Sequence, residues 1–398
     1  MGLRINEIVV STTGVDREFL ELFGTPGQRL EGFSIVQVRS GGEIADVIQL
    51  GGVVGINGHF LLASPEAESV LGVEGDQQIA DNTFTNGSRT HLLVEGDAWS
   101  VGGDIDVNDD GVADSGFAPL IVDGIAVIGS DSPLVYAPNV VGPDGSFLAP
   151  GGYRDPVGTG GFLMHSFSDP SLYSPTASVE VAINEIVVST TGTDKEFIEF
   201  VGLPGTDLSG LTLLEIEPGG EIDTVLPLTG TVGGNGHYLV SSPAAEAALG
   251  VTGDQSMPDN TFTNGSRTYL LVDGFTGTGG DDIDIDDDGV IDSAPWGAIV
   301  DSVAPIGSVS PLIYSANVIG PDGAFLSPGG YRDPAASGGF EQHDFFDARL
   351  YSPNASAPFA INEIVVSTTG TEKEFIEFVG LPGTDLSGLT LLEIEPGG

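Results

Sequence analysis

The chain lacks cysteine and has few basic residues. With 0 cysteines it can form no disulfide, no zinc–thiolate site and no thiol nucleophile. Its 11 lysines and arginines face 58 aspartates and glutamates, which gives a formal net charge of -47. Such a surface repels phosphate groups, so we expect no direct binding to nucleic acid or to anionic membranes. Most carboxylates also lack a basic partner, which favours cations as counter-charges.

Long apolar segments are also missing. No apolar run reaches the length of a membrane span, and Met1–Asn6 is not a signal peptide. We therefore expect that any export signal lies outside this chain. Hydrophobic residues still make up 40%, which is enough to build cores, while 60 glycines and 25 prolines favour turns and short strands over long helices.

The sequence repeats itself. The segment Ile5–Gly14 returns at Ile183 and again at Ile361, a constant offset of 178 residues. Residues 183–220 and 361–398 differ at one position, Asp194 against Glu372. We predict one repeat over residues 1–180, a second over 181–358, and the truncated start of a third over 359–398, whose opening strands have no partner sheet.

Within one repeat the pattern is mostly strand. Short β-branched and aromatic runs separated by glycine and proline turns predict strands. In the second repeat these are Ile183–Ser189, Glu196–Val201, Leu211–Ile216, His237–Val240, Thr268–Val272 and Ala298–Val303. One short helix per repeat is predicted, because Ser64 and Ser242 are N-cap residues followed by proline, and Gly72 and Gly250 are stop signals.

The opening of each repeat resembles the lamin tail domain family. The matching motifs are Ile183–Ile186, Glu196–Phe200 and the Leu208–Gly210 step, and later Asn264-Gly265 and Ile299–Val303. The resemblance implies an all-β fold of tandem immunoglobulin-like β-sandwich repeats without chemistry of their own. In bacteria, such domains resemble accessory modules of secreted nucleases, phosphoesterases and surface proteins. This chain departs from the family pattern by an acidic insertion and by a long tail after the sandwich.

The acidic insertion carries the strongest chemical signal. Oxygen ligands at loop positions 1, 3 and 5, a glycine at position 6, the carbonyl of position 7 and a carboxylate at position 9 are typical of the start of an EF-hand-like calcium loop. The predicted Ca2+ ligands are Asp106, Asn108, Asp110, Val112 and Asp114 in the first repeat and Asp284, Asp286, Asp288, Val290 and Asp292 in the second. Phe117 and Pro295 stand at position 12, so the bidentate glutamate is missing. The alternative is a solvated acidic turn.

Two glutamates lie among apolar residues of the opening strands. By strand alternation, Glu185 shares a face with Ile183 and Val187. Glu199 shares a face with Phe197 and Val201 in the same way. Two such carboxylates on neighbouring strands could be a general acid and base. The favoured alternative is structural: they accept hydrogen bonds from turn amides or pair with Arg267.

Four of the five histidines recur at the repeat offset, His59 with His237 and His165 with His343, whereas Tyr269 replaces His91. His165 precedes Asp169 by four residues, as His343 precedes Asp347. Such a pair could take part in a metal site, but no third ligand is evident, and a partly buried or loop histidine is the favoured interpretation.

These observations predict a non-catalytic, calcium-stabilised repeat module that acts in binding, in adhesion or as a structural stalk. We expect it to be extracellular or at the cell surface, with neighbouring repeats and a protein or polysaccharide surface as partners. The alternative is an accessory part of a secreted nuclease or phosphoesterase whose catalytic domain lies outside this chain. A hydrolase built from Glu185, Glu199 and a histidine is the least favoured hypothesis, because no nucleophile motif is present.

Overall fold

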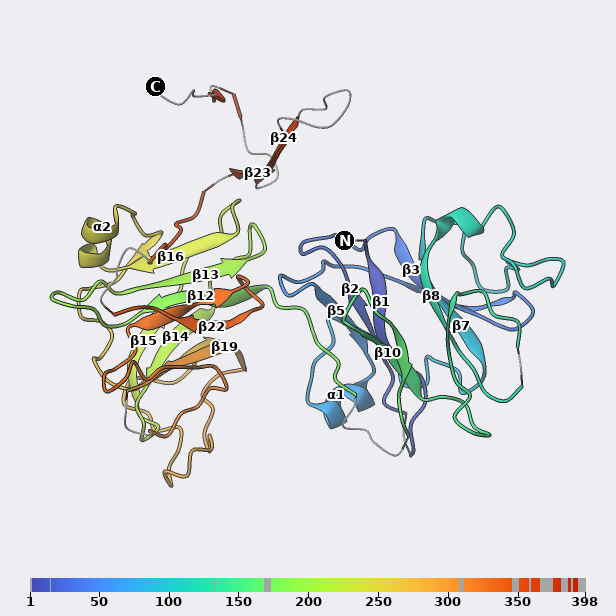
Figure 1. Cartoon of the computed structure of the whole chain (residues 1–398). Helices are drawn as coiled ribbons and strands as arrows, with labels where there is room; N and C mark the ends of the chain where they lie inside the picture. Colours follow the sequence, from blue (N-terminus) through green and yellow to red (C-terminus); the bar gives the residue numbers. More distant parts are fainter. Residues whose placement is uncertain are drawn as a thin grey trace. The chain divides into compact units, whose positions relative to one another are not determined.

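The protein consists of two compact units, residues 1–179 and 180–398 (Figure 1). The computed structural model describes residues 2–14, 16–131, 133–167, 173–307, 311–345, 351–357, 359–365, 375–380, 386–387 and 389–392. Each unit is described by itself below.

The first unit contains a six-stranded sheet and a five-stranded sheet. In spatial order, the six-stranded sheet comprises β11 (Gly161–Met164), β10 (Gly151–Asp155), β1 (Arg4–Val9), β2 (Phe19–Phe23), β5 (His59–Ala63) and β6 (Gln77–Gln78). The five-stranded sheet comprises β4 (Ile44–Gln49), β3 (Phe33–Val38), β7 (Arg89–Glu95), β8 (Ile121–Val127) and β9 (Asn139–Val141). The chain alternates between the two sheets, so each is assembled from segments distant in sequence.

The second unit repeats this arrangement strand for strand. Its six-stranded sheet comprises β17 (Gln255–Ser256), β16 (His237–Ser241), β13 (Phe197–Gly202), β12 (Val181–Val187), β21 (Gly329–Asp333) and β22 (Gly339–Gln342). Its five-stranded sheet comprises β15 (Ile222–Pro227), β14 (Leu211–Ile216), β18 (Thr268–Asp273), β19 (Ala298–Pro305) and β20 (Val318–Ile319). The prediction of an all-β fold of tandem β-sandwich repeats is confirmed.

The main core of each unit lies between its two sheets. In the second unit, Ile186 and Phe200 of the six-stranded sheet pack in one buried cluster with Leu213 and Leu271 of the five-stranded sheet. A second cluster joins Leu214 and Leu270 to residues of the acidic insertion and is described with the site. Because both faces of the central strands are covered, their apolar residues form nearly continuous runs instead of a strict alternation.

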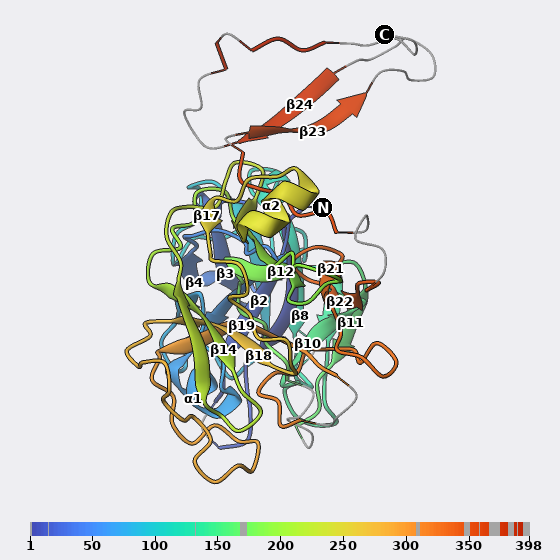
Figure 2. The ribbon, with the colours of Figure 1, turned by 90° about the vertical axis from the view of Figure 1, so that its left-hand side faces the viewer.

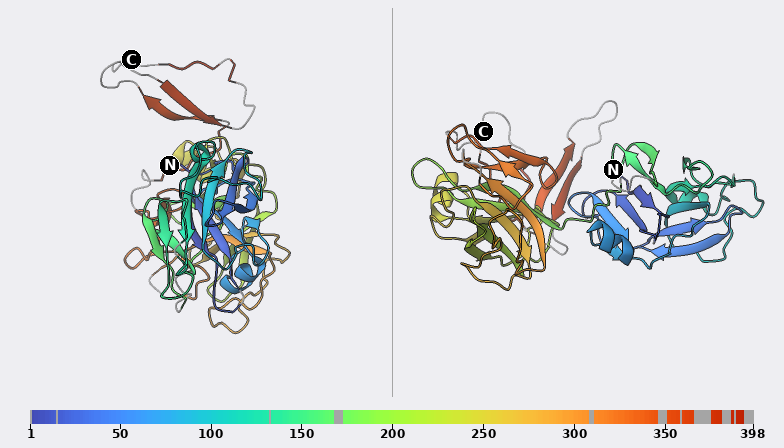
Figure 3. Two further views of the ribbon diagram at one scale, coloured as in Figure 1. Left: turned by 90° about the vertical axis from the view of Figure 1, so that its right-hand side faces the viewer. Right: turned by 90° about the horizontal axis from the view of Figure 1, so that it is seen from below.

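Among its described residues, each unit has one short α-helix, as predicted: α1 (Pro65–Leu71) and α2 (Pro243–Leu249). Ser242 accepts a hydrogen bond from the Ala245 amide (3.2 Å), and Gly250 ends α2 in the left-handed conformation with φ of 73°. Figure 2 shows α2 as the short yellow coil beside β17, and Figure 3 shows α1 as the short blue coil of the first unit. No described helix is long and apolar enough to cross a membrane.

The segment expected to be a tail after the sandwich is part of it, which corrects the sequence prediction. β21 pairs with β12 and β22 pairs with β21, so the late segment extends the six-stranded sheet. Arg332 fixes it: its Nη2 lies 2.7 Å from Asp301 Oδ1 in β19 and its Nε donates to the Ile183 carbonyl (2.8 Å). A mostly buried arginine thus joins the late segment to both sheets, a long-range contact that local pattern cannot reveal.

The opening strands also deviate from simple alternation. β12 and β13 shift register between Ile183 and Glu185, a β-bulge that β1 and β2 repeat between Ile5 and Glu7. The extra residue turns Glu185 away from the face of Ile183 and Ile186, which belong to the main core. The prediction that Glu185 shares a face with Ile183 is therefore wrong, because strict alternation does not hold across a bulge.

In the last part of the chain, β23 (Phe359–Val365) and β24 (Phe375–Gly380) form a two-stranded sheet (Figure 2). Its apolar side chains Ile364 and Phe378 are 55% and 43% exposed, whereas their counterparts Ile186 and Phe200 are fully buried. The difference follows from the packing: among the described strands β23 and β24 pair only with each other, so no second sheet covers their apolar face.

Candidate functional site

The acidic loops lie in the insertion between β7 and β8 and in the one between β18 and β19. Each insertion is a packed layer over the five-stranded sheet. In the second unit, Ile283 is fully buried against Leu214, Leu270 and Tyr314. The first insertion places Ile105 and Trp99 in the same way. A buried isoleucine directly before the loop therefore holds its first aspartate against the domain.

Asp284, at loop position 1, is the residue around which the second loop folds, and we call it the pivot. Its side chain is fully buried. Its Oδ2 accepts hydrogen bonds from Tyr314 Oη (2.8 Å) and the Gly289 amide (2.8 Å), and its Oδ1 accepts from the Asp288 amide (3.1 Å). Burial raises the pKa of this carboxyl, but these hydrogen bonds outweigh it and the pKa is lowered from its ordinary value. The pivot is thus kept as a carboxylate.

The loop bends around Asp284 through two left-handed residues. Asp287 has φ of 55° and Gly289 has φ of 88°. At position 6, a glycine meets this backbone requirement without strain. The first loop has the same shape: Asp109 and Gly111 have φ of 55° and 82°, and Tyr136 Oη donates to Asp106 Oδ2 (3.0 Å).

Three predicted ligands come together in the second loop. Carboxylate oxygens of Asp284, Asp286 and Asp292 all lie within 4.8 Å of one another, so the three could hold a metal ion. The pKa of Asp286 is raised, first by the charge of Asp288 and then by burial and the charges of Asp292 and Asp284. Like charges are therefore crowded there, and a bound cation would relieve their repulsion.

The fourth predicted carboxylate of the second loop lies outside that group. Asp288 Oδ1 accepts the amide of Val290 (2.8 Å) and so helps to close the turn. Coordination of the ion by the Val290 carbonyl, and by the Val112 carbonyl in the first loop, stays a prediction.

The first loop differs at position 3. Asn108 replaces Asp286, and its Nδ2 donates to Asp110 Oδ2 (2.9 Å). Asp114 Oδ2 accepts the Val107 amide (3.2 Å), as Asp292 Oδ2 accepts the Ile285 amide (3.0 Å). Over the described ranges, no second group of three carboxylates or imidazoles converges in this way. The first loop thus offers one carboxylate fewer.

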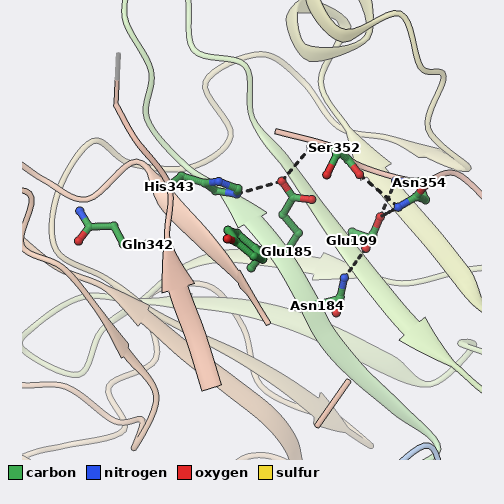
Figure 4. A pocket seen from close by; sticks show the side chains of 8 residues that line it. Asn184, Glu185, Glu199, Gln342, His343, Ser352 and Asn354 are labelled. Atoms are coloured by element: carbon green, nitrogen blue, oxygen red, sulfur yellow. Dashed lines mark hydrogen bonds and ion pairs between the residues drawn. The ribbon is translucent and has the colours of Figure 1, made fainter. Parts of the chain in front are cut away.

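The strand glutamates are paired with the recurring histidines. Glu185 and Glu199 stand directly opposite each other on β12 and β13 (Figure 4). His343 Nε2 lies 2.9 Å from Glu185 Oε1, and His237 Nδ1 lies 3.3 Å from Glu199 Oε1. Burial raises the pKa of Glu185, and His343 opposes that rise. The first unit repeats the pairs, His165 with Glu7 (3.0 Å) and His59 with Glu21 (3.2 Å).

The glutamates also accept backbone hydrogen bonds, as the structural interpretation predicted, although from a later segment than a hairpin turn. The Ser352 amide donates to Glu185 Oε1 (3.3 Å) and the Asn354 amide to Glu199 Oε2. The predicted pairing with Arg267 is wrong. Arg267 faces the five-stranded sheet, with Nη2 3.0 Å from Glu217 Oε1 and Nε 3.8 Å from Glu215 Oε1.

Sequence reasoning missed the histidine–glutamate pairs. The available signal was that both members recur at the repeat offset, although nothing in the sequence says which pairs meet. Asp169 and Asp347, the residues predicted to accompany His165 and His343, lie outside the described residues.

Comparisons with known proteins identify no family. No family model matches the chain, and no curated protein matches it. A solved structure described as "Crystal structure of tetra-tandem repeat in extending region of large adhesion protein" aligns with 70% of this chain and 71% of its own, at 16% identity and a TM-score of 0.15. A TM-score this low establishes no shared fold or function, and the resemblance to lamin tail domains stays a prediction.

Proposed function

We propose that this chain is a calcium-stabilised, non-catalytic β-sandwich repeat that works outside the cell as a structural or adhesive element. The observation that supports this most directly is the convergence of Asp284, Asp286 and Asp292 within 4.8 Å. Calcium suits such a site because it takes six to eight oxygen ligands, which carboxylates, a backbone carbonyl and water supply together.

The loop is built so that an ion would stabilise the whole unit. Asp284 is hydrogen bonded to Tyr314, whose ring packs in the same buried cluster as Leu214 and Leu270 of the five-stranded sheet. An ion that binds the folded loop better than the unfolded chain stabilises by mass action, by about 2.7 kcal/mol at a hundredfold excess over Kd. Magnesium should stabilise less, because it dehydrates reluctantly and requires an octahedral site.

The non-catalytic part of the proposal rests on the strand glutamates. Both oxygens of Glu199 accept hydrogen bonds, Oε1 from Asn184 (2.6 Å) and Oε2 from Asn354, and His237 faces it as well. A carboxylate held in this way fixes the sheet and is poorly placed to exchange protons with a substrate. The repetition of these pairs in both units favours a structural role, and we infer that lamin-tail-like architecture is used here as a repeated building block.

Calorimetric titration of the whole chain with calcium at moderate ionic strength tests the proposal. We expect saturable binding, and terbium bound in the loop should luminesce on tyrosine excitation, because Tyr314 Oη lies 2.8 Å from Asp284. Asp286→Asn, which copies the first loop, should weaken binding in the second unit. Glu31→Gln removes one charge outside both loops and is the control. Absence of saturable binding would reduce both loops to solvated acidic turns.

A further inference from the structure

The six-stranded sheet of the first unit ends in an exposed, apolar edge strand. β11, labelled in Figure 2, is the last strand in the order of that sheet, and among the described strands it pairs with β10 alone. β9 of the other sheet lies near β11 but forms no ladder with it. Leu163 and Met164 of β11 are 46% and 41% exposed. An uncovered apolar edge of this kind is a template for pairing with another strand.

The free edge of β11 presents backbone groups that a further strand can engage. The His165 amide donates to the Gly151 carbonyl (3.0 Å), which makes these two residues a hydrogen-bonded pair of the ladder between β11 and β10. Such pairs alternate along an antiparallel ladder, so Leu163 also bonds to β10. Its neighbours Phe162 and Met164 therefore direct their N–H and C=O groups to the open side.

The equivalent edge of the second unit carries charge. β22 has the same register against β21 as β11 has against β10, but Glu341 and Gln342 replace Leu163 and Met164, and Asp344 follows. In the first unit, by contrast, residues 156–168 include no Asp, Glu, Lys or Arg. A charged residue on an edge strand discourages pairing with another strand. The edge of the first unit lacks this protection.

We propose that β11 joins a second copy of this chain by antiparallel edge pairing about a two-fold axis. Leu163 stands on the axis, opposite the partner's Leu163. Phe162 pairs with the partner's Met164 and Met164 with the partner's Phe162, so that the outward N–H and C=O groups of both copies exchange hydrogen bonds. Because the same strand is used on both sides, each donor meets an acceptor, as a two-fold contact requires.

The side chains favour this register in the first unit and oppose it in the second. Residues on the axis form a non-hydrogen-bonded pair, in which the Cα atoms approach to about 4.5 Å and the side chains are closest. Two leucines there cover each other's exposed apolar surface. The same register in the second unit would bring Glu341 opposite the partner's Glu341, and like charges directly opposite each other destabilise a sheet. Self-pairing is therefore assigned to the first unit.

The absence of charge on β11 favours a second copy over a strand of another protein. With a net charge of -47, most of the surface repels another copy, and this uncharged edge is a place where two copies can meet. Salt screens the remaining repulsion, over about 10 Å at 0.1 M. A contact built on one short strand belongs to the small, transient class of interfaces, below about 1,200 Å². We therefore expect a weak dimer whose association strengthens with salt.

The contact goes beyond the proposed function and does not depend on it. β11 lies on the six-stranded sheet, whereas the acidic insertion of the first unit packs on the five-stranded sheet. The dimer should therefore form without calcium.

Disulfide trapping tests the register, because the chain has no cysteine of its own. A non-hydrogen-bonded pair brings the Cα atoms within the range that a disulfide spans. Under mild oxidation, the whole chain with Leu163→Cys should form linked dimers at least roughly tenfold faster than with Val101→Cys, because pairing raises the local concentration of the thiols. Val101 is 65% exposed in the acidic insertion and reports random collision. Met164→Cys and Glu341→Cys should also be slow.

Sedimentation velocity of the whole chain in about 0.5 M sodium chloride, where charge repulsion is screened, measures the association itself. The original chain should form a concentration-dependent dimer. Leu163→Glu, which copies the second unit, should abolish it, whereas Val101→Glu adds the same charge elsewhere and should leave it intact. Glu341→Leu should open the second edge and produce species larger than the dimer.

Three results would overturn the proposal. A chain that stays monomeric under these conditions would leave the edge to another protein or to none. Equal trapping of Leu163→Cys and Val101→Cys, or faster trapping of Met164→Cys than of Leu163→Cys, would exclude the register. A dimer unaffected by Leu163→Glu would place the contact elsewhere. Asp286→Asn and a calcium chelator separate this proposal from the proposed function, since both should leave the dimer unchanged while they weaken the calcium response.

Discussion

The two units carry different pairs of polar residues at one equivalent buried position. In the first unit, Gln37 of β3 stands opposite His91 of β7, and in the second Glu215 of β14 stands opposite Tyr269 of β18. His91 and Tyr269 pack against equivalent rings, Phe84 at 5.3 Å and Phe262 at 5.0 Å between centroids. The same fold thus accepts either pair, and the difference lies in how the polar atoms are satisfied.

The pair in the second unit is hydrogen bonded throughout. Glu215 Oε1 accepts from Tyr269 Oη (3.1 Å) and the Thr263 amide (2.8 Å), and Oε2 accepts from Thr224 Oγ1 (2.8 Å). In the first unit, His91 Nδ1 is buried without a partner among the described residues, and burial lowers the pKa of His91 to about 3, with Arg89 adding to the effect. One unit therefore carries a satisfied carboxylate and the other a neutral imidazole that resists protonation.

The largest expected consequence is a different response to acid. A histidine whose pKa falls from 6.5 to about 3 on folding is protonated first in the unfolded chain, so stability is lost as the pH falls from 6.5 toward 3. The loss in the first unit should reach about 3 kcal/mol at pH 4. Glu215 acts in the opposite sense: burial raises its pKa, so it stabilises the second unit at acid pH relative to neutral. We expect the first unit to unfold at higher pH.

The chain has one tryptophan for each unit, which allows this to be measured. Trp99 packs in the cluster between the acidic insertion and the five-stranded sheet of the first unit, and Trp296 borders the equivalent cluster of the second. Trp296→Phe leaves a fluorescence reporter of the first unit and Trp99→Phe one of the second. Adding Gln37→Glu with His91→Tyr should bring the acid transition of the first unit to that of the second. Coincident transitions in the two original reporters would contradict the role given to His91.

Glu18 and Glu196 add a pH-dependent contribution to stability that is the same in both units. Burial raises the pKa of each to about 7, so their contribution to stability is complete below about pH 4.5 and is lost as the pH rises toward 7. Since this contribution has the same sign in both units, it does not separate their acid transitions.

A smaller effect is expected from removing one hydroxyl. Tyr269→Phe keeps the ring but takes a donor from Glu215, and an acceptor left short of a partner in the core costs about 1–3 kcal/mol. The matched change His91→Phe removes a buried nitrogen that has no described partner, and should leave the first unit as stable or more stable. Urea denaturation of both variants, each followed through its own tryptophan, measures the two costs. Equal destabilisation of the units would show that ring packing alone decides at this position.

The sequence revealed the parts of this fold that depend on local chemistry. Both helices follow from Ser, Pro and Gly at their ends, and Leu211–Ile216 was predicted with the bounds that the structure has. The loop bend around Asp284 also follows, because residue spacing and a glycine at position 6 are local features.

What could not be predicted depends on long-range pairing. β21 joins β12 across more than a hundred residues, and Arg332 meets Asp301 and the Ile183 carbonyl only once both sheets are assembled. The bulge at Glu185 arises from how two strands align, and it decides which face that carboxylate takes. Recurrence at the repeat offset therefore revealed that the glutamates and histidines matter together, but neither which of them meet nor the face that Glu185 takes.

The smallest expected effect sharpens the comparison of the two loops. Asn108 and Asp286 occupy position 3, and the aspartate belongs to the converging group of the second loop. Asn108→Asp gives the first loop the same carboxylates as the second, so we expect its calcium affinity to rise about tenfold, or about 1.4 kcal/mol. The gain is limited because Asn108 already offers an oxygen and because its amide now donates to Asp110, a contact that the variant loses. The reciprocal Asp286→Asn should lower the calcium affinity of the second loop by a similar factor, and the two changes made together should exchange the order in which the loops bind calcium.

Terbium luminescence excited through tyrosine resolves this order. Tyr136→Phe removes the signal of the first loop and Tyr314→Phe that of the second, since each hydroxyl lies against the first aspartate of its own loop. If Asn108→Asp leaves the first loop unchanged while Asp286→Asn weakens the second, the difference between the loops lies in backbone placement and not in the count of carboxylates.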